Sequence, residues 1–221
     1  MRTVLDSADV FVLSEPVGPF AMNQYLVGCA RSGKAAIIDA GGPPEAFMEA
    51  ARLRGVRIVA ILQTHAHIDH VLGLPETRTA LPHAPIWLHS NEVPLYDGVV
   101  MQARMFGLRA TALPAVTDWI EQGSRIAVGD LRFECLLTPG HSPGHICFHE
   151  ATQGFVFGGD LLFRGSIGRT DLPGADPAAM RKSLRKIMTL PDETRVFPGH
   201  MGDTTIAQER RSNPFIADAL S

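Results

Sequence analysis

Four side chains able to bind metal ions lie close together in the segment THAHIDH, at residues 64–70. In an extended backbone His65 and His67 project to the same side, where both imidazoles can share one ion. Asp69 and His70 are adjacent, so they reach a second point if the chain turns there. We therefore expect this loop to supply ligands to two metal positions about 3.5–4 Å apart, as in two-metal hydrolytic sites.

A buried strand is expected to carry this loop. The preceding run RIVAILQ, at residues 57–63, is almost continuously aliphatic, which is typical of a strand in a sheet covered on both faces. Ligands bind to such sheets at the carboxyl ends of the strands. A solvated loop with ordinary surface histidines is the alternative, but it gives no reason for four such residues to gather after a buried strand.

The segment TPGHSPGH, at residues 138–145, supplies a further imidazole. It follows an expected strand at 133–137, and its prolines and glycines predict a tight, rigid turn. We expect His141 to be the ligand, because it lies at the carboxyl end of that strand. His145 opens the next strand instead.

Asp160 and His200 complete the predicted ligand set. Asp160 follows an apolar strand at 155–159, and its two carboxylate oxygens suit a bridge that holds two cations at a fixed separation. A simple Gly-Gly-Asp turn is the alternative. His200 follows a last strand at 195–197 and would complete the imidazole pair of the second ion. Nitrogen and oxygen ligands of these kinds suit zinc, and also iron or manganese.

Composition limits the class of protein. The chain has 221 residues, of which 45% are hydrophobic and 19% charged, as in an ordinary soluble protein with one α/β domain. Its net charge of −3 offers no basic surface for nucleic acid. Acids at Asp6 and Asp9 interrupt the amino-terminal segment, and no apolar run is long enough to span a membrane. We therefore expect a cytoplasmic protein that binds neither nucleic acid nor membranes.

The rest of the chain alternates strand and helix patterns. We expect strands at 10–13, 24–29, 35–39, 85–89, 124–128, 131–137 and 145–149, and helices at 43–55, 71–81, 92–109, 176–188 and 205–212. Gly129-Asp130 is a strong signal for a hairpin turn. Scattered and odd in number, the three cysteines are expected to be small core residues rather than disulfides or zinc ligands: Cys29, Cys135 and Cys147.

Two features of this pattern each allow two interpretations. Met101, Met105 and Phe106 recur at helical spacing within 92–109, which favours a buried stripe, with a mobile apolar wall of a substrate pocket as the alternative. Asp39 ends a strand, where capping or turning the chain is the simpler role. Support of the metal ligands from behind is its alternative role.

Together these motifs resemble those of the metallo-β-lactamase fold, and the resemblance covers nearly the whole chain. The segments that carry the resemblance are THAHIDH, TPGHSPGH, FGGDLLF at 157–163 and FPGHMGDTT at 197–205. The segments FRGSIGRTDLPG at 163–174 and TTIAQERRSNPF at 204–215 are similar to the glyoxalase II branch, and within it to the short bacterial type. The resemblance implies an α/β fold, a four-layer αββα sandwich in one domain over residues 1–221, with a metal site in the cleft between its sheets.

Roles for single residues follow from this resemblance. It implies that the first metal is bound by His65, His67 and His141, and the second by Asp69, His70 and His200, with Asp160 bridging both. Two departures matter. Full-length glyoxalase II carries a helical carboxy-terminal extension that binds the glutathione part of the substrate, and we expect this chain to lack it. Met201 stands where the pattern often has glycine, which would narrow the mouth of the cleft.

The expected activity is hydrolysis of a small-molecule thioester of the S-acylglutathione type. Two divalent ions, zinc first among the candidates, would lower the pKa of a shared water from about 15.7 to near 7, so that a metal-bound hydroxide attacks the thioester carbonyl. Asp69 and Asp160 are the expected catalytic carboxylates, and Asp69 would also orient the hydroxide. Arg169 is expected either to pair with Asp171 or to bind a substrate carboxylate.

Two other functions compete with this one. Persulfide dioxygenases resemble this fold and share the GRTD stretch, and they use one iron, which here would be bound by His65, His141 and Asp160. The RTDLPG and PGHMGDTT segments favour the hydrolase. A non-catalytic binding protein braced by metal is the second competitor. Structural zinc sites are normally closed and rich in cysteine, which a set of seven nitrogen and oxygen ligands is not.

Overall fold

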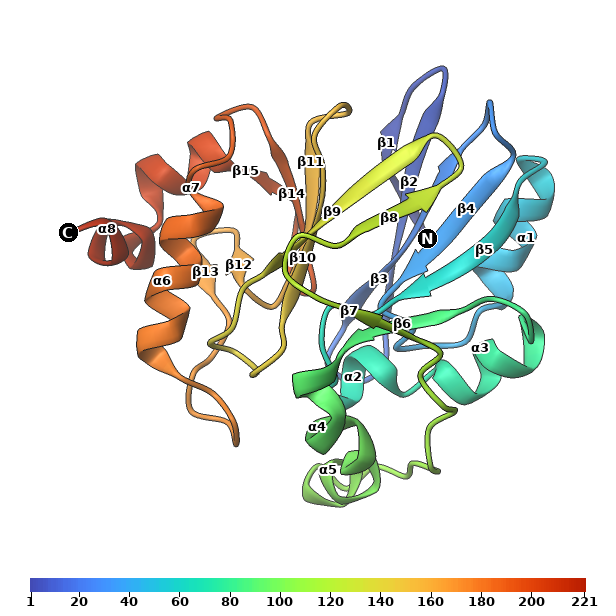
Figure 1. Cartoon of the computed structure of the whole chain (residues 1–221), viewed down its shortest axis with the longest axis horizontal. Helices are drawn as coiled ribbons and strands as arrows, with labels where there is room; N and C mark the ends of the chain where they lie inside the picture. The colour runs from blue at the N-terminus through green and yellow to red at the C-terminus, as the bar shows by residue number, and fades with distance from the viewer. The chain divides into compact units, whose positions relative to one another are not determined.

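Two mixed β-sheets with their own helices make up the chain in the computed structural model, which describes residues 1–221 (Figure 1). The residues divide into two units. The amino-terminal unit comprises Met1–Ile120 and Ala127–Leu131, and the carboxy-terminal unit comprises Glu121–Ile126 and Arg132–Ser221. The α/β composition agrees with the sequence pattern, while the single domain over residues 1–221 stays a prediction.

The amino-terminal unit contains a seven-stranded sheet in the order β1-β2-β3-β4-β5-β6-β7. Neighbouring strands from β1 to β4 are antiparallel, whereas those from β4 to β7 are parallel. The carboxyl ends of β4 and β5 therefore lie at the same edge, which brings Asp39 close to the 64–70 loop. The strands are β1 Arg2–Asp6, β2 Val10–Val17, β3 Met22–Cys29, β4 Lys34–Ile38, β5 Arg57–Leu62, β6 Ile86–His89 and β7 Asp118–Ile120.

Short helices pack on this sheet through small and aliphatic side chains. In α1, Phe47, Ala50 and Ala51 are buried, and Gly55 adopts a positive φ of 65° just beyond the helix, as is usual for a C′ glycine. These residues share one core with strand residues such as Ile37. The helices are α1 Glu45–Leu53, α2 Ile68–Val71, α3 Leu74–Ala80, the 3-10 helix η1 Ser90–Glu92, α4 Val93–Asp97 and α5 Val99–Met105.

A second, six-stranded sheet has the order β15-β14-β11-β10-β9-β8. It belongs to the carboxy-terminal unit except for residues Ala127–Leu131, at the hairpin between β8 and β9. Strand β11 is parallel to β14, and β10 is antiparallel to both β9 and β11. Strands β9, β11 and β14 thus run in one direction, and the residues that follow them lie at one edge of the sheet. The strands are β8 Arg125–Val128, β9 Leu131–Leu137, β10 Ile146–Glu150, β11 Phe155–Gly159, β14 Arg195–Pro198 and β15 Thr204–Thr205, beside a small hairpin of β12 Leu162–Phe163 and β13 Ser166–Ile167.

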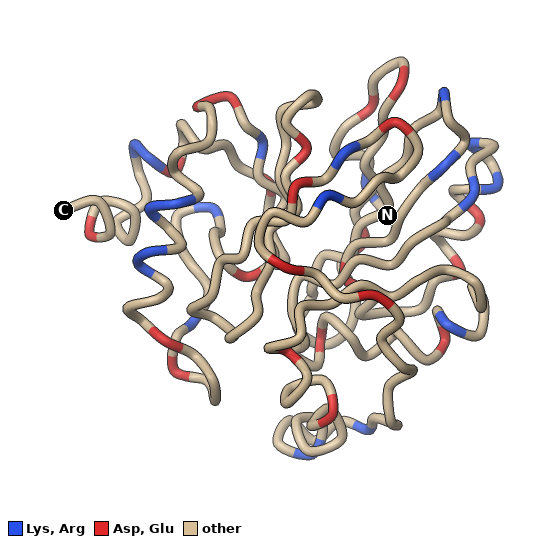
Figure 2. Tube along the Cα trace, in the orientation of Figure 1, with Lys and Arg blue, Asp and Glu red and all other residues tan.

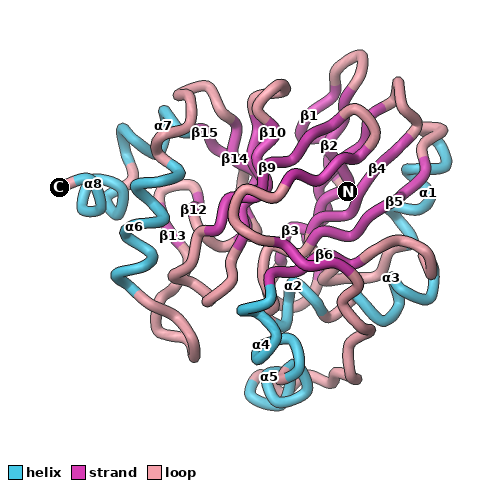
Figure 3. The backbone as a smooth tube through the Cα atoms, in the orientation of Figure 1, coloured by secondary structure: helices cyan, strands magenta, loops and turns pink.

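Three helices pack on one face of this second sheet (Figure 3), namely α6 Pro177–Ile187, α7 Ile206–Ser212 and α8 Pro214–Leu220. Side chains cap the N-termini of α6 and α7. Asp176 accepts hydrogen bonds from the backbone N–H groups of Ala178 and Ala179, and Thr205 accepts one from Gln208. Met180 and Leu184 of α6 are buried in the core of this unit.

The expected single helix at 92–109 is wrong in two respects. Gly98 separates α4 from α5, and both helices are short. The predicted buried stripe faces solvent instead, since Met101, Met105 and Phe106 are 61%, 67% and 46% exposed. Tyr96, Val99 and Ala103 are the buried residues here. Helical spacing alone cannot tell which side of a short helix meets the core.

Several elements of the structure were not predicted from the sequence, among them β1, β7 and α8. Strands β1 and β7 lie at the two edges of the first sheet, and α8 follows α7 directly, with Asn213 as its N-cap. The prediction ended at Asn213-Pro214, although proline in a first turn is compatible with a new helix. The hairpin at Gly129-Asp130 is confirmed, because β8 ends and β9 begins on either side of it and Gly129 has a φ of 63°.

Acidic and basic residues are distributed over both units (Figure 2). Several form exposed ion pairs, such as Arg181 with Asp218 at 3.0 Å. Each such pair contributes at most about 1 kcal/mol to stability, so these pairs do not determine the fold. No helix is both long enough and apolar enough to cross a membrane.

Candidate metal centre

The predicted ligands of the amino-terminal unit lie on the loop between β5 and α2 and in the first turn of α2. His65 and His70 are fully buried, His67 is 8% exposed, and the Asp69 side chain is 15% exposed. The ring centroid of His65 lies 4.9 Å from that of His67 and 4.0 Å from that of His70. His70 Nε2 is 3.9 Å from Asp69 Oδ2. The loop therefore gathers its four predicted ligands, as expected.

Asp39 fixes this group from the neighbouring strand. Its Oδ1 accepts a hydrogen bond from the backbone N–H of Thr64 at 2.7 Å, and its Oδ2 accepts one from the Thr64 hydroxyl at 2.8 Å. The same Oδ2 is 2.9 Å from His70 Nδ1. Asp39 also has a positive φ of 55°, an uncommon conformation that aspartate tolerates better than most residues. The supporting role, which was the alternative interpretation, is therefore the one observed.

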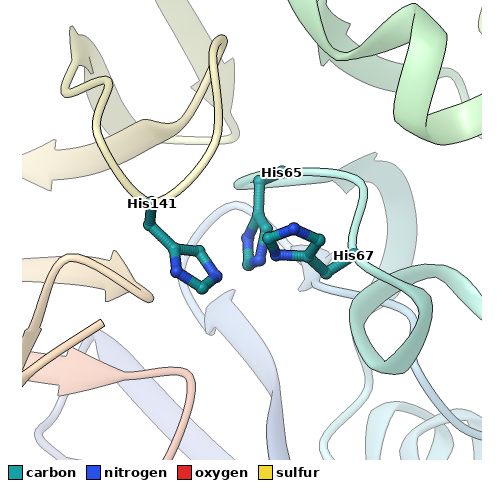
Figure 4. A group of neighbouring side chains, drawn as sticks. All are labelled: His65, His67 and His141. Carbon is teal, nitrogen blue, oxygen red and sulfur yellow. The ribbon is translucent and has the colours of Figure 1, made fainter. Parts of the chain in front are cut away.

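Hydrogen bonds at Nδ1 orient two of these imidazoles. His65 Nδ1 lies 3.0 Å from the Thr64 hydroxyl, as His70 Nδ1 lies beside Asp39. A hydrogen bond at one ring nitrogen sets the tautomer and directs the other nitrogen to a metal. Nε2 is accordingly the nitrogen that His65 and His70 would offer to an ion. Figure 4 shows His65 and His67 side by side on their loop, and His141 on the loop that follows β9.

The carboxy-terminal unit brings together its own three predicted ligands. Asp160 Oδ2 lies 3.4 Å from His141 Nε2 and 3.5 Å from His200 Nε2. His141 follows β9, Asp160 follows β11 and His200 follows β14, so the shared direction of these strands explains their convergence. The backbone N–H of Gly199 donates to the carbonyl of Gly159 at 2.7 Å and ties two of the loops together. One carboxylate oxygen thus lies close to two imidazoles, and the bridging role of Asp160 stays a prediction.

Backbone groups and a second histidine hold these ligands in place. His141 Nδ1 lies 2.8 Å from the carbonyl oxygen of Arg169, which directs Nε2 towards Asp160. The backbone N–H of Asp160 donates to His145 Nε2 at 2.9 Å, and His145 Nδ1 lies 2.9 Å from the Thr138 hydroxyl. Because His145 Nε2 accepts a hydrogen bond, His145 supports Asp160 rather than acting as a ligand itself, in agreement with the preference for His141.

The segment after β13 packs closely behind this group. A Cβ atom added at Gly168 would lie 1.8 Å from the carbonyl oxygen of Asp160 and 3.1 Å from His141 Nδ1. Only glycine fits there without displacement of the backbone. The Arg169 side chain is exposed and bonds Asp171 through two hydrogen bonds, at 2.6 and 2.8 Å. These bonds lower the pKa of the Asp171 carboxyl and raise the pKa of the Arg169 guanidinium. The expected ion pair with Asp171 is thus present, while the binding of a substrate carboxylate by Arg169 stays a prediction.

Both ligand groups fit divalent metal ions. The donors are imidazole nitrogens and carboxylate oxygens, which bind zinc and similar ions at about 2.0–2.2 Å. Two donors at about 2.1 Å from a tetrahedral ion are roughly 3.4 Å apart, farther than the hydrogen-bond range of about 2.7–3.2 Å. The distances from Asp160 Oδ2 to His141 Nε2 and His200 Nε2, 3.4 and 3.5 Å, match the spacing of two ligands of one ion.

Sequence reasoning missed several residues that support the site. Gln63, at the end of β5, donates from Nε2 to the carbonyl of His70 at 2.7 Å and accepts from the backbone N–H of Ala40 at 2.9 Å. Its polar side chain at the end of an aliphatic run was an available signal. Glu92 and Gln102 also bond this loop, from helices far along the chain. No spacing rule connects residues 26 and 34 positions apart, so Glu92 and Gln102 could not be recognised from the sequence.

Comparison with known sequences gives one family. The chain matches the family model of the metallo-beta-lactamase superfamily over residues 17–200. It is 37% identical to hydroxyacylglutathione hydrolase GloC of Haemophilus influenzae, over 91% of this chain and 95% of the relative. It is also 37% identical to the probable metallo-hydrolase YqgX of Bacillus subtilis, with the same shares covered.

Solved structures of similar fold agree with this. A crystal structure of TTHA1623 in a di-iron-bound form has a TM-score of 0.84 and 43% identity, covering 92% of this chain and 99% of that one. The BLEG-1 B3 metallo-beta-lactamase has a TM-score of 0.85 and 33% identity, over 93% and 99%. ETHE1 from Myxococcus xanthus has a TM-score of 0.76 and 25% identity, over 94% and 84%.

Proposed function

The chain belongs to the metallo-beta-lactamase superfamily and is a metal-dependent hydrolase of that fold, and from this premise we propose that it hydrolyses thioesters of the S-acylglutathione type. Relatives that match nearly the whole chain support the proposal, among them the hydroxyacylglutathione hydrolase of Haemophilus influenzae. The segments GRTDLPG and PGHMGDTT, which resemble the short bacterial glyoxalase II type, point to the same substrate class.

We propose further that the two ligand groups complete one centre for two divalent ions. The single observation that carries this is Asp160 Oδ2, which lies within 3.5 Å of two separate imidazoles. In the proposed centre His65, His67 and His141 would hold one ion, Asp69, His70 and His200 would hold the other, and Asp160 would be a ligand of both. Zinc, iron and manganese all suit this donor set.

When bound, such ions supply Lewis acidity and lower the pKa of a coordinated water towards 7, from about 15.7 in bulk. The chain contributes the geometry around them. Asp69, which is partly exposed, would accept a hydrogen bond from the attacking water and orient it towards the thioester carbonyl. Asp39, Gln63 and His145 hold the ligands rigid through hydrogen bonds, so little reorganisation is needed during the reaction. The thiolate leaves as the acid forms, and needs little help from a general acid.

The test is a substrate panel assayed with metal-loaded protein. We expect S-lactoylglutathione and related acylglutathiones to be hydrolysed at a kcat/KM at least about 100-fold above that for an ester or a β-lactam. A chromogenic cephalosporin belongs in the panel because a B3 metallo-beta-lactamase is among the similar structures. Preference for the cephalosporin, or no thioesterase activity in protein that contains metal, would contradict the proposal.

A persulfide dioxygenase remains the second candidate, and the similarity to ETHE1 from Myxococcus xanthus favours it. In that function one iron would be bound by His65, His141 and Asp160. Oxygen uptake with glutathione persulfide separates the two candidates directly, because hydrolysis of a thioester consumes no oxygen. We expect no oxygen uptake above the rate of metal-free protein.

A further inference from the structure

His67 stands at the N-cap position of α2, but its side chain makes no capping hydrogen bond to that helix. An N-cap side chain ordinarily accepts a hydrogen bond from an N–H group of the first turn, which has no partner within the helix. A histidine that capped α2 would direct its ring back over the helix. A ring that accepts a hydrogen bond at one nitrogen carries its proton on the other nitrogen, which then cannot bind a metal.

Gln102 of α5 bonds the backbone on both sides of His67. Its Oε1 accepts a hydrogen bond from the N–H of Ile68 at 3.1 Å, and its Nε2 donates to the carbonyl of Ala66 at 3.2 Å. Nε2 also donates to the carbonyl of Leu95 at 2.7 Å. Both amide hydrogens are thereby used, so the oxygen must face Ile68. The orientation of this amide is set by three contacts.

Glu92 holds the third polar group of this stretch. Its fully buried carboxylate accepts a hydrogen bond from the backbone N–H of Ala66 at 2.8 Å. Glu92 ends η1 and Gln102 lies in α5, which is packed against the sheet through Val99 and Ala103. The support for His67 therefore comes from helices fixed in the core of the amino-terminal unit.

We propose that Gln102 is a positioning residue for His67. It holds the backbone on both sides of His67, through the carbonyl of Ala66 and the N–H of Ile68, and so fixes the direction in which the His67 imidazole leaves the loop. This inference rests on the proposed metal centre, and it adds a consequence that the ligand set alone does not have. Loss of the Gln102 oxygen weakens the ion bound by His67 more than the ion bound by His70.

The experiment is a stepwise Co²⁺ titration of metal-free protein, followed by visible absorption, with urea unfolding of the same metal-free samples. Gln102→Met removes all three hydrogen bonds at nearly constant volume. We expect it to raise the Kd of one binding step by about tenfold or more, as measured for residues that orient metal ligands, and to change the other step by less than about threefold. If Gln102→Met bound Co²⁺ with the Kd of wild type in both steps, the proposal would be overturned.

Gln102→Glu separates positioning from general stability. It keeps an acceptor oxygen for the N–H of Ile68 but loses the donated bonds to Ala66 and Leu95. We expect both variants to unfold at lower urea concentration, and only Gln102→Glu to retain a Kd within about threefold of wild type. This variant also serves as the test if Gln102→Met does not fold. A Kd for Gln102→Glu about tenfold weaker than wild type would assign Gln102 a merely structural role.

Gln208 supplies the matched control. It is a helical glutamine of the other unit that donates from Nε2 to the Ser212 hydroxyl, at 3.1 Å and in an exposed position. Gln208→Met is expected to bind Co²⁺ as wild type does in both steps. Wild-type protein that bound no Co²⁺ would refute the metal centre itself, whereas normal wild-type binding with an unaffected Gln102→Met would refute only the role of Gln102.

Discussion

At the scale of single residues, the proposed centre is defined by which nitrogen each histidine presents. His65, His70 and His141 all have a hydrogen-bond partner at Nδ1: a hydroxyl, a carboxylate and a backbone carbonyl. Each ring thereby leaves Nε2 as the nitrogen for the proposed ion. The convergence of these residues within each unit was predictable from the sequence, because histidines and aspartates follow buried strands, whereas their role as metal ligands stays a prediction. The partners at Nδ1 were not predictable, apart from Asp39.

Asp160 offers the sharpest test among the ligands. Asp160→Asn replaces one carboxylate oxygen by an amide nitrogen, which cannot bind a metal in the same way, and removes the charge that balances two cations. We expect the metal content to fall from about two ions per chain to one or fewer, and kcat/KM for thioesters to fall by more than about 100-fold. Metal analysis and steady-state kinetics measure both. Asp171→Asn, an exposed carboxylate in the same unit, is the control and should retain two ions.

Arg169 is predicted to act on the substrate and not on the fold. Its side chain is 59% exposed and forms an ion pair with Asp171. Its contact with His141 is made by the backbone carbonyl, which any residue at this position would keep. Arg169→Ala should therefore change the free energy of unfolding by less than about 0.5 kcal/mol. We expect it to raise KM for thioesters that carry a carboxylate and to leave KM for neutral thioesters unchanged. Equal effects on both classes would reduce Arg169 to a surface ion pair.

At the scale of elements, strand direction explains why distant residues meet within each unit. Parallel pairing of β4 with β5 places Asp39 beside the 64–70 loop, and the common direction of β9, β11 and β14 gathers His141, Asp160 and His200. Strands and their ends could be predicted from aliphatic runs and from turn residues. The exposed face of α5 could not, because its methionine spacing is equally compatible with core and surface.

Gly168 links one such element to the site. Its added Cβ would overlap the carbonyl oxygen of Asp160, and backbone cannot move aside as a flexible side chain can. Gly168→Ala should lower the free energy of unfolding by about 1–3 kcal/mol and reduce metal content as well. Urea unfolding and metal analysis provide the readout. Gly165→Ala is the control, and this variant should keep its metal. A Cβ atom added at Gly165 has no neighbour within 4 Å, so the only strain comes from the positive φ of 70°.

At the scale of the whole molecule, all three cysteines are buried, which shows that the cores of both units exclude solvent. Cys29, Cys135 and Cys147 are free and at most 1% exposed, as the sequence predicted for small core residues. Burial raises the pKa of the Cys135 thiol to about 12, so almost no reactive thiolate exists at neutral pH.

A thiol reagent should therefore find no rapidly reacting cysteine in the native protein and three after unfolding in urea. The measurement is the absorbance released by the reagent over time in each condition. One thiol reacting at the unfolded rate in the native protein would show that the unit which contains it opens readily.

The central claim is that seven side chains of this chain hold two divalent ions together. Elemental analysis of protein purified without chelators tests it most directly. We predict close to two ions per chain, of zinc, iron or manganese, removed together by dialysis against a chelator. A reproducible content of one ion per chain, or of none in folded protein supplied with these metals, would contradict the two-metal centre.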